Sequence, residues 1–194
     1  MWTGAGIAPP GAVDSPALYP RHAGTYRDSL IAREFRGTVK FALIDRIVEL
    51  HPPERIVAVK AVSLAEEYLA DHFPTFPVLP GVLMLESLAE AAAWLVRASE
   101  DFAHSMILLR EAKNVTYKSF VKPGYLLRSE VTCRQLAQGG SDFTGVGSCD
   151  GKEVLKARFS LRHFNLADES KALAPIDSRI IEHVRERFTL LSES

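Results

Sequence analysis

The chain has 194 residues, of which 47% are hydrophobic and 24% are charged, and its formal net charge at pH 7 is -1. This length suits one domain with a single core. The charge balance argues against nucleic acid as the principal partner, because such a surface needs an excess of positive charge. No segment predicts a membrane span, since Glu86 and Glu90 interrupt the most apolar one. Two cysteines, Cys133 and Cys149, and no recognisable secretion leader favour a reducing cytoplasm.

The N-terminal residues 1–24 are rich in Gly, Ala and Pro and have no apolar periodicity, so we expect a flexible arm. The main domain is predicted to cover residues 25–166. A short helix over 28–35 is one reading of its start, followed by an irregular strand over 39–48. A second strand over 55–62 suits antiparallel pairing with the first.

The centre of the chain predicts one long helix. After a proline-rich loop, residues 82–97 are strong helix formers with apolar side chains on nearly every side. At 1.5 Å per residue this helix spans roughly 24 Å. We therefore expect a helix buried all round and long enough to cross a sheet that curls around it.

Four further segments have strand character, and turn-forming pairs separate them. The segments cover residues 106–115, 126–136, 143–148 and 154–164, and the turn pairs are Pro123-Gly124, Gly139-Gly140 and Asp150-Gly151. Six antiparallel strands around one apolar helix make an α+β fold. The strand order does not follow from the sequence.

The C-terminal residues 167–194 predict a linker and an amphipathic helix over 175–191. Packing against its own domain, service as a lid and contact with a second subunit all remain open for this helix.

A proton-transfer site is predicted in the run from His72 to Leu88. A histidine titrates near neutral pH, and a carboxylate such as Glu86 has its pKa raised on an apolar helix, so the two can serve as base and acid at one pH. The helix that opens at Gly81 has unpaired N–H groups at its positive end, where one can bond an oxygen that gains negative charge. The alternatives are a structural histidine, a carboxylate held by backbone amides and a glycine that only turns the chain.

The spacing H-F-P-x-x-P-x-x-P-G-V-L-x-x-E-x-L-A in this run resembles the signature of the 3-hydroxyacyl-acyl carrier protein dehydratases. The resemblance covers about residues 38–166 and implies the hotdog fold, an antiparallel sheet wrapped around a long central helix. It implies reversible removal of water from 3-hydroxyacyl thioesters on acyl carrier protein, giving trans-2-enoyl thioesters in fatty-acid biosynthesis. It also implies a homodimer whose sites each take the histidine from one chain and the acid from the other, with a trimer of dimers left open.

The resemblance assigns a role to each residue of the predicted site. His72 is the base that removes a proton from the carbon next to the thioester carbonyl, Glu86 is the acid that protonates the departing hydroxyl, and the N–H of Gly81 bonds the thioester oxygen. The reaction needs no organic cofactor and no metal, and we find no zinc-type ligand spacing in the sequence.

Apolar residues near the motif are candidates for an acyl channel, with ordinary core packing as the alternative. They are Phe73, Phe76, Pro80, Leu83, Leu88, Trp94 and Phe120. Glu90 either raises the proton affinity of Glu86 one turn away or points to another polar partner. Four basic residues, Lys118, Lys122, Arg128 and Arg158, could dock an acidic carrier protein or could be ordinary solvated charges.

Three positions depart from the usual family pattern. Asp71 and Thr75 stand where glycines are common, and Tyr125 stands where an acidic residue is common. Two alternatives remain: another hotdog thioester enzyme, such as a thioesterase or coenzyme A hydratase, and a non-catalytic acyl-binding subunit, for which Asp71 and Thr75 are the best support. The lack of an H-x-N-N thioesterase segment and of a separate Asp and His hydratase motif argues against the first alternative, and the presence of both His72 and Glu86 argues against the second.

Overall fold

An antiparallel sheet and two long helices dominate the computed structural model, which describes residues 42–70 and 72–193. The predicted arm over 1–24 and the predicted helix over 28–35 lie outside these residues. All described residues fall in one compact unit. In chain order the elements are β1 (Arg46–His51), β2 (Arg55–Ala61), the 3-10 helix η1 (Glu67–Leu69), α2 (Gly81–Ser99), β3 (Met106–Tyr117), β4 (Leu126–Ala137), β5 (Gly140–Cys149), β6 (Lys152–Phe164), the 3-10 helices η2 (Leu166–Asp168) and η3 (Lys171–Leu173), and α3 (Ala174–Ser192).

The six strands form one sheet in the order β1-β2-β4-β5-β6-β3, and every neighbouring pair is antiparallel. The chain reverses between β5 and β6 at Asp150 and Gly151, whose φ angles are 49° and 73°. Asparagine, aspartate and glycine tolerate this left-handed region, so the turn predicted from the residue pair is confirmed. The strand β3 lies at one edge of the sheet.

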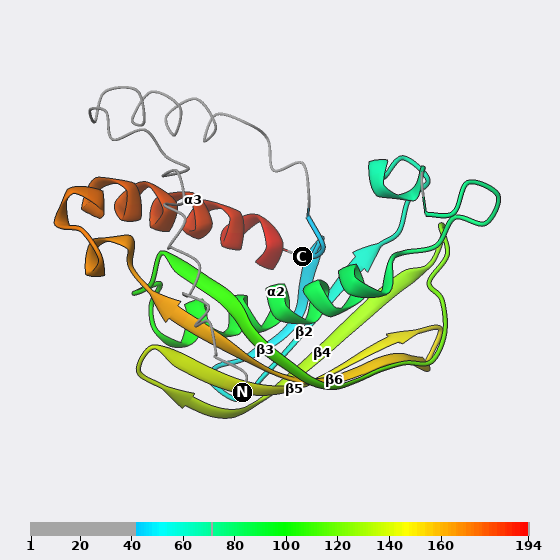
Figure 1. Cartoon of the computed structure of the whole chain (residues 1–194), viewed down its shortest axis with the longest axis horizontal. Helices are drawn as coiled ribbons and strands as arrows, with labels where there is room; N and C mark the ends of the chain where they lie inside the picture. Colours follow the sequence, from blue (N-terminus) through cyan, green and yellow to red (C-terminus); the bar gives the residue numbers. More distant parts are fainter. Residues whose placement is uncertain (1–41, 71, 194) are drawn as a thin grey trace, which may run out of the picture. The chain divides into compact units, whose positions relative to one another are not determined.

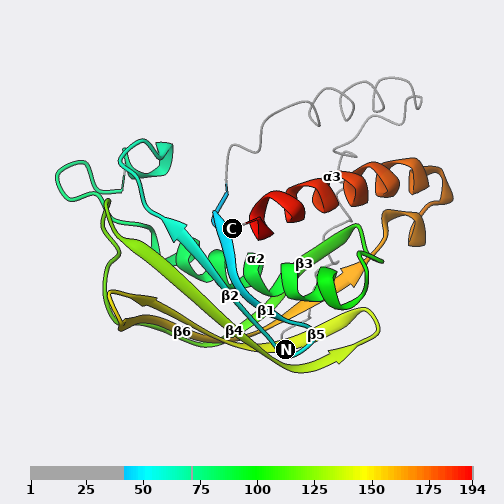
Figure 2. The ribbon, with the colours of Figure 1, turned by 180° about the vertical axis from the view of Figure 1, so that it is seen from behind.

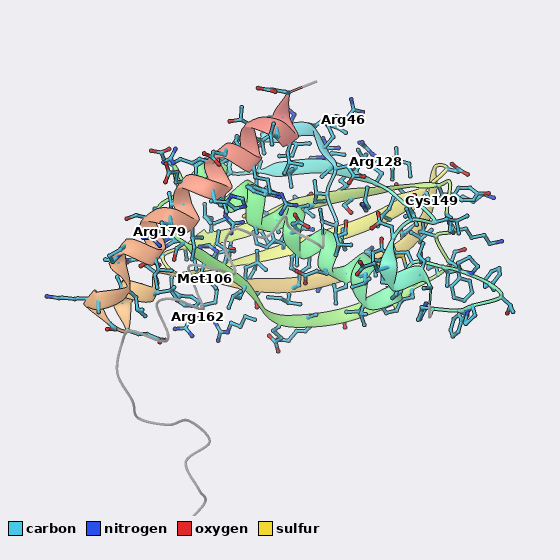
Figure 3. All side chains as sticks on the ribbon, turned by 90° about the horizontal axis from the view of Figure 1, so that it is seen from above. Arg46, Met106, Arg128, Cys149, Arg162 and Arg179 are labelled. Atoms are coloured by element: carbon cyan, nitrogen blue, oxygen red, sulfur yellow. The ribbon has the colours of Figure 1, made fainter. Side chains whose placement is uncertain are left out.

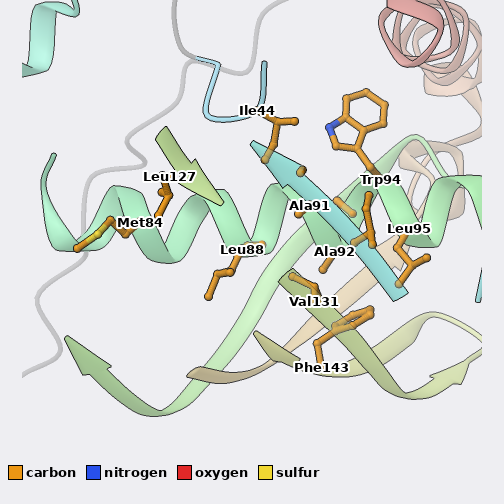
Figure 4. Close-up of a cluster of buried hydrophobic side chains, with 14 of the residues drawn as sticks. Ile44, Met84, Leu88, Ala91, Ala92, Trp94, Leu95, Leu127, Val131 and Phe143 are labelled. Carbon is orange, nitrogen blue, oxygen red and sulfur yellow. The ribbon is translucent and has the colours of Figure 1, made fainter. Parts of the chain in front are cut away.

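The helix α2 lies against the concave face of the sheet, as Figure 1 shows, and Figure 2 shows the same arrangement from behind. Its inward side chains meet residues of the sheet such as Leu127, Val131 and Phe143 (Figure 4). A Cβ atom placed on Gly145 of β5 would lie 2.9 Å from Leu88 Cδ1. The glycine therefore lets α2 approach the sheet closely.

The prediction of a helix buried all round is wrong for the first half of α2. Val82 is 68% exposed and Glu86 is also exposed, whereas Leu88 and the residues that follow it are mostly buried. The sheet and α3 cover the second half, whereas one face of the first half is left open by the described residues of the single chain.

The four strands predicted after α2 are confirmed, with shifted ends, but the first strand begins later than expected. β1 starts at Arg46, and Leu43 and Ile44 precede it outside any strand although each is only 1% exposed. The backbone N–H of Leu43 donates to the Glu90 carboxylate at 3.0 Å instead of to a neighbouring strand. The apolar pattern at Leu43 and Ile44 therefore reflects burial of these side chains and not strand pairing.

The predicted C-terminal helix is confirmed as α3, which lies across α2 on the side away from the sheet (Figure 1). Phe188 of α3 packs against Trp94 and Phe102, with ring centroids 6.0 and 5.4 Å apart. At the start of the helix, Asp177 accepts hydrogen bonds from the backbone N–H groups of Leu166 and Ala167. Of the three roles left open for this helix, packing on its own domain is the one observed.

We predict that Leu88→Ala lowers the free energy of unfolding by about 3 kcal/mol, because it removes buried methyl groups from the contact between α2 and the sheet. Urea denaturation followed by circular dichroism at one protein concentration measures this change. The matched control is Leu190→Ala on α3, where a side chain that is 72% exposed should change stability by less than about 0.5 kcal/mol. Equal losses in the two variants would contradict the assignment of Leu88 to the core.

Candidate active site

His72 lies in the loop between η1 and α2, and its ring is oriented by the backbone. Its Nδ1 atom is 3.2 Å from the Val78 carbonyl oxygen, and the Val78 N–H donates to the His72 carbonyl at 3.0 Å. A carbonyl oxygen only accepts, so Nδ1 carries the proton in this contact. Nε2 of a neutral ring then keeps its lone pair, which is the form that a general base requires.

Gly81 opens α2 next to this loop. The preceding Pro80 offers no side-chain cap, and its carbonyl accepts from the N–H groups of Leu83 and Met84 at 2.9 and 3.2 Å. The first N–H groups of a helix have no intrahelical acceptor, and they lie at its positive end. No acidic residue occupies the first turn. The start of α2 is therefore suited to bind an oxygen that develops negative charge.

The absence of a side chain at Gly81 also lets β3 approach the start of α2. A Cβ atom on Gly81 would lie 3.1 Å from Cε1 of the Tyr117 ring. Any larger residue at this position would have to displace that ring.

Glu86 lies on the open face of α2, so it is more exposed in the single chain than the sequence led us to expect. Among the described residues its carboxylate has no hydrogen bond and no ion pair. Partial desolvation raises its pKa, and the negative charge of Glu90 one turn further on raises the pKa again. Glu86 thus keeps its proton to a higher pH than an ordinary glutamate, as a general acid should.

Glu90 has the polar partners that the sequence left open. One carboxylate oxygen accepts from the Leu43 N–H at 3.0 Å, and the other accepts from Arg187 of α3 at 2.8 Å. Burial raises the pKa of Glu90, while the positive charge of Arg187 opposes that rise. Both readings of Glu90 therefore have support, because it is paired and its charge also acts on Glu86.

Exposed aromatic rings surround the His72 loop. Phe73, Phe76 and Phe120 are 51%, 42% and 61% exposed. The Phe73 ring lies 4.4 Å from that of His72, and the Phe76 and Phe120 rings meet edge to face at 6.0 Å. Such a grouping of exposed apolar side chains suits an acyl chain or a protein partner.

The remaining channel candidates divide between the helix start and the core. Pro80 and Leu83 are half-buried near the opening of α2, where they can still meet a ligand. Leu88 and Trp94 are 0% and 2% exposed and belong to the hydrophobic core, so their ordinary packing role is confirmed.

The four basic residues proposed for docking do not form one surface. Lys118 and Lys122 line a groove of about 400 Å³ together with Phe120 and Tyr125, close to the aromatic rings. Arg158 lines a different groove of about 470 Å³ between β3, β4, β5 and β6. Arg128 pairs with Glu49 at 3.2 Å.

The structure also brings together three residues that the sequence reading missed. Ligand atoms of Glu100, His104 and His163 all lie within 4.8 Å of one another. The spacing Glu-x-x-x-His of the first two was the available signal in the sequence. His163 joins them from a distant strand, so only the fold reveals the group.

Residues 37–158 match the FabA-like domain family. The chain belongs to this family. Among its relatives, a 3-hydroxyacyl-acyl-carrier-protein dehydratase FabZ of Symbiobacterium thermophilum is 38% identical over 128 residues, which cover 66% of this chain and 88% of that protein. The FabZ dehydratase of Wolbachia pipientis wMel is 33% identical over 120 residues, which cover 62% of this chain and 84% of that protein.

A solved structure confirms the hotdog fold of this FabA-like chain. The dehydratase heterocomplex ApeI:P of Xenorhabdus doucetiae matches with a TM-score of 0.57 at 16% identity, over 74% of this chain and 97% of that one. Within the described residues, no helix is long and apolar enough to cross a membrane.

We predict that Glu90→Gln lowers the pKa of Glu86, because it removes the negative charge that disfavours ionisation one turn away. Glutamine keeps a carbonyl oxygen for the Leu43 N–H, so the local backbone is preserved. Carbon-13 NMR of labelled glutamate side chains, followed against pH, measures the change. Glu182→Gln on the exposed face of α3 is the control and should leave the titration of Glu86 where it was.

Proposed function

We propose that this FabA-like chain catalyses the reversible dehydration of 3-hydroxyacyl thioesters carried on acyl carrier protein to trans-2-enoyl thioesters, as in fatty-acid biosynthesis. The observation that carries the proposal is the presence of a histidine whose Nδ1 donates to a backbone carbonyl, leaving Nε2 as a base, together with a glutamate whose pKa is raised by partial burial and by Glu90. Both occur at the motif positions of a family whose similar relatives bear the name of this dehydratase.

The chemistry follows from the three groups in turn. Nε2 of His72 removes the proton from the carbon next to the thioester carbonyl, and the electron pair moves toward the carbonyl oxygen. The N–H groups at the start of α2 stabilise the charge on that oxygen. The electrons then return to form the carbon–carbon double bond, while Glu86 gives its proton to the hydroxyl group that leaves as water.

We propose that the site is completed by a second copy of the chain. No hydrogen bond or ion pair links His72 to Glu86 within the described part of one chain, and Glu86 lies on an open face of α2. Within the described residues the strand β3 leaves one side unpaired at the edge of the sheet, which is a ready surface for pairing with another copy. Val82 and the exposed phenylalanines would be covered by the same contact.

The partner that presents the substrate is proposed to be an acidic acyl carrier protein. The groove lined by Lys118, Lys122 and Phe120 combines positive charge with apolar surface beside the His72 loop. Cys133 and Cys149 are free thiols, which supports a reducing cytoplasm as the compartment.

We predict that His72→Ala and Glu86→Gln each lower the rate of dehydration about 10²- to 10⁴-fold, the usual contribution of a general base or acid. The assay uses 3-hydroxydecanoyl-acyl carrier protein and mass spectrometry to follow the loss of water. His51→Ala changes an exposed histidine at the end of β1 and should retain full activity. If the wild type binds acyl-carrier ligands but forms no product at any chain length, the chain is a binding subunit.

We predict that mixing the two inactive variants restores activity if the site is shared between chains. Random reassociation makes half of the dimers mixed, and each mixed dimer has one site with both an intact histidine and an intact glutamate, so about a quarter of the wild-type rate should return. If both groups came from the same chain, no mixed dimer would contain a complete site and no activity would return.

A further inference from the structure

A second cluster of chemically active side chains lies at the end of α2 opposite to the candidate active site. Glu100 follows the last residue of α2, His104 lies four residues beyond it, and His163 comes from β6. Glu100 is about four helical turns from Glu86, roughly 21 Å along the helix axis. Arg162 and Met106 mark the same end of the sheet in Figure 3, while Cys149 lies at the other end.

The distances in the cluster fit metal coordination better than hydrogen bonding. Glu100 Oε2 lies 3.4 Å from His104 Nε2 and 3.3 Å from His163 Nδ1. Hydrogen bonds between charged groups of this kind are shorter, at about 2.7–2.9 Å. Two ligand atoms held about 2.05 Å from one tetrahedral ion would be separated by about 3.3 Å.

The atoms that face the centre of the cluster lack other partners. Glu100 Oε2 and His163 Nδ1 are buried without a hydrogen bond in the part of the chain that the structure describes. The side chain of His163 is 0% exposed. A buried polar atom without a partner destabilises the folded state, so an ion bound between these groups would increase the free energy of unfolding.

Ser141 of β5 supplies the support that metal-binding histidines usually have. Its hydroxyl oxygen lies 2.7 Å from His163 Nε2. When Nε2 donates its proton to Ser141, the lone pair of Nδ1 faces the Glu100 carboxylate, and a cation between these two acceptors would satisfy both.

The surrounding charges leave room for a cation. Arg97 is a positive charge that acts on His163, but its guanidinium lies over the Trp94 ring at 5.1 Å and is also attracted by Glu90. The Glu100 carboxylate offers a negative ligand. Glu100 and His104 are 21% and 22% exposed, so ions and water can enter from the surface.

We propose that Glu100, His104 and His163 bind one divalent cation of the zinc class, with a water molecule as the fourth ligand. Two imidazoles and one carboxylate are a donor set that zinc accepts in tetrahedral geometry. The proposal does not depend on the dehydratase function, because none of the three residues belongs to that site.

The ion would lie next to the hydrogen bonds that attach α3 to the rest of the domain. Ser105, next to His104, donates its hydroxyl to Asp177 of α3, and its N–H donates to Asn165 at 2.8 Å. Asn165 lies two residues after His163. A metal at the cluster would therefore join the end of α2 to β6 directly beneath the attachment of α3, as a structural site.

We predict that the full-length, tag-free chain, stripped with EDTA, takes up one Zn²⁺ per chain, and that a hundredfold excess of Zn²⁺ over its Kd raises Tm by about 5 °C or more. Elemental analysis after dialysis measures the stoichiometry, and a thermal melt with ZnCl₂ or MgCl₂ measures the shift. Glu100→Gln and His104→Gln should each abolish both effects. Glu182→Gln and His183→Gln, at two adjacent exposed positions of α3, are the matched controls and should retain both Zn²⁺ uptake and the rise in Tm.

Two further measurements guard against misfolded variants and adventitious binding. Co²⁺ added to the wild type should give the strong visible absorption of a tetrahedral site. His104→Cys should keep uptake and add a sulfur-to-cobalt charge-transfer band. Three results would each overturn the proposal: no Zn²⁺ uptake by the wild type, unchanged uptake by Glu100→Gln and His104→Gln, or loss of uptake when Cys133 and Cys149 are alkylated. None of these results would change the dehydration rate measured in the same samples, so the two proposals are tested separately.

Discussion

The close packing of α2 on the concave face of the sheet is the constraint on which the rest of the structure depends. Leu88 fits against Gly145 because that position has no side chain, and the contact fixes the depth of the helix in the sheet. The burial of apolar surface along this helix supplies much of the stability of the domain. Since this rigid helix carries both Gly81 and Glu86, its placement also positions the groups that each chain contributes to the candidate site.

The same helix divides the molecule into two functional ends. At its start, the His72 loop, the unpaired N–H groups and the exposed Glu86 are open to a substrate or a second chain. At its far end, Glu100 meets histidines from the following turn and from β6, and α3 closes over the outside. The candidate active site and the proposed metal site thus lie at opposite ends of α2.

The alternation and turn pairs of the sequence were enough to predict five of the strands, both long helices and the α+β class. These patterns wrongly predicted a strand where a residue is buried without strand pairing. Leu43 is the example, because its N–H donates to the Glu90 side chain of α2 instead of to a neighbouring strand. The exposure of Glu86 could not be predicted either, because it depends on which side of α2 the sheet and α3 leave uncovered. His163 could be grouped with Glu100 only after the strands had been placed.

The contact between Arg187 and Glu90 gives the C-terminal helix an influence on chemistry inside the shared dehydratase domain. Arg187 lies outside residues 37–158, yet its positive charge favours the ionised form of Glu90. An ionised Glu90 in turn favours the protonated form of Glu86. Replacement of Arg187 by a neutral residue would leave Glu90 without this cation, and Glu90 would take up a proton more readily. Glu86 would then lose its own proton at lower pH. Arg187 of α3 therefore extends to higher pH the range over which Glu86 stays protonated, although no hydrogen bond or ion pair joins these two residues within the described part of the chain.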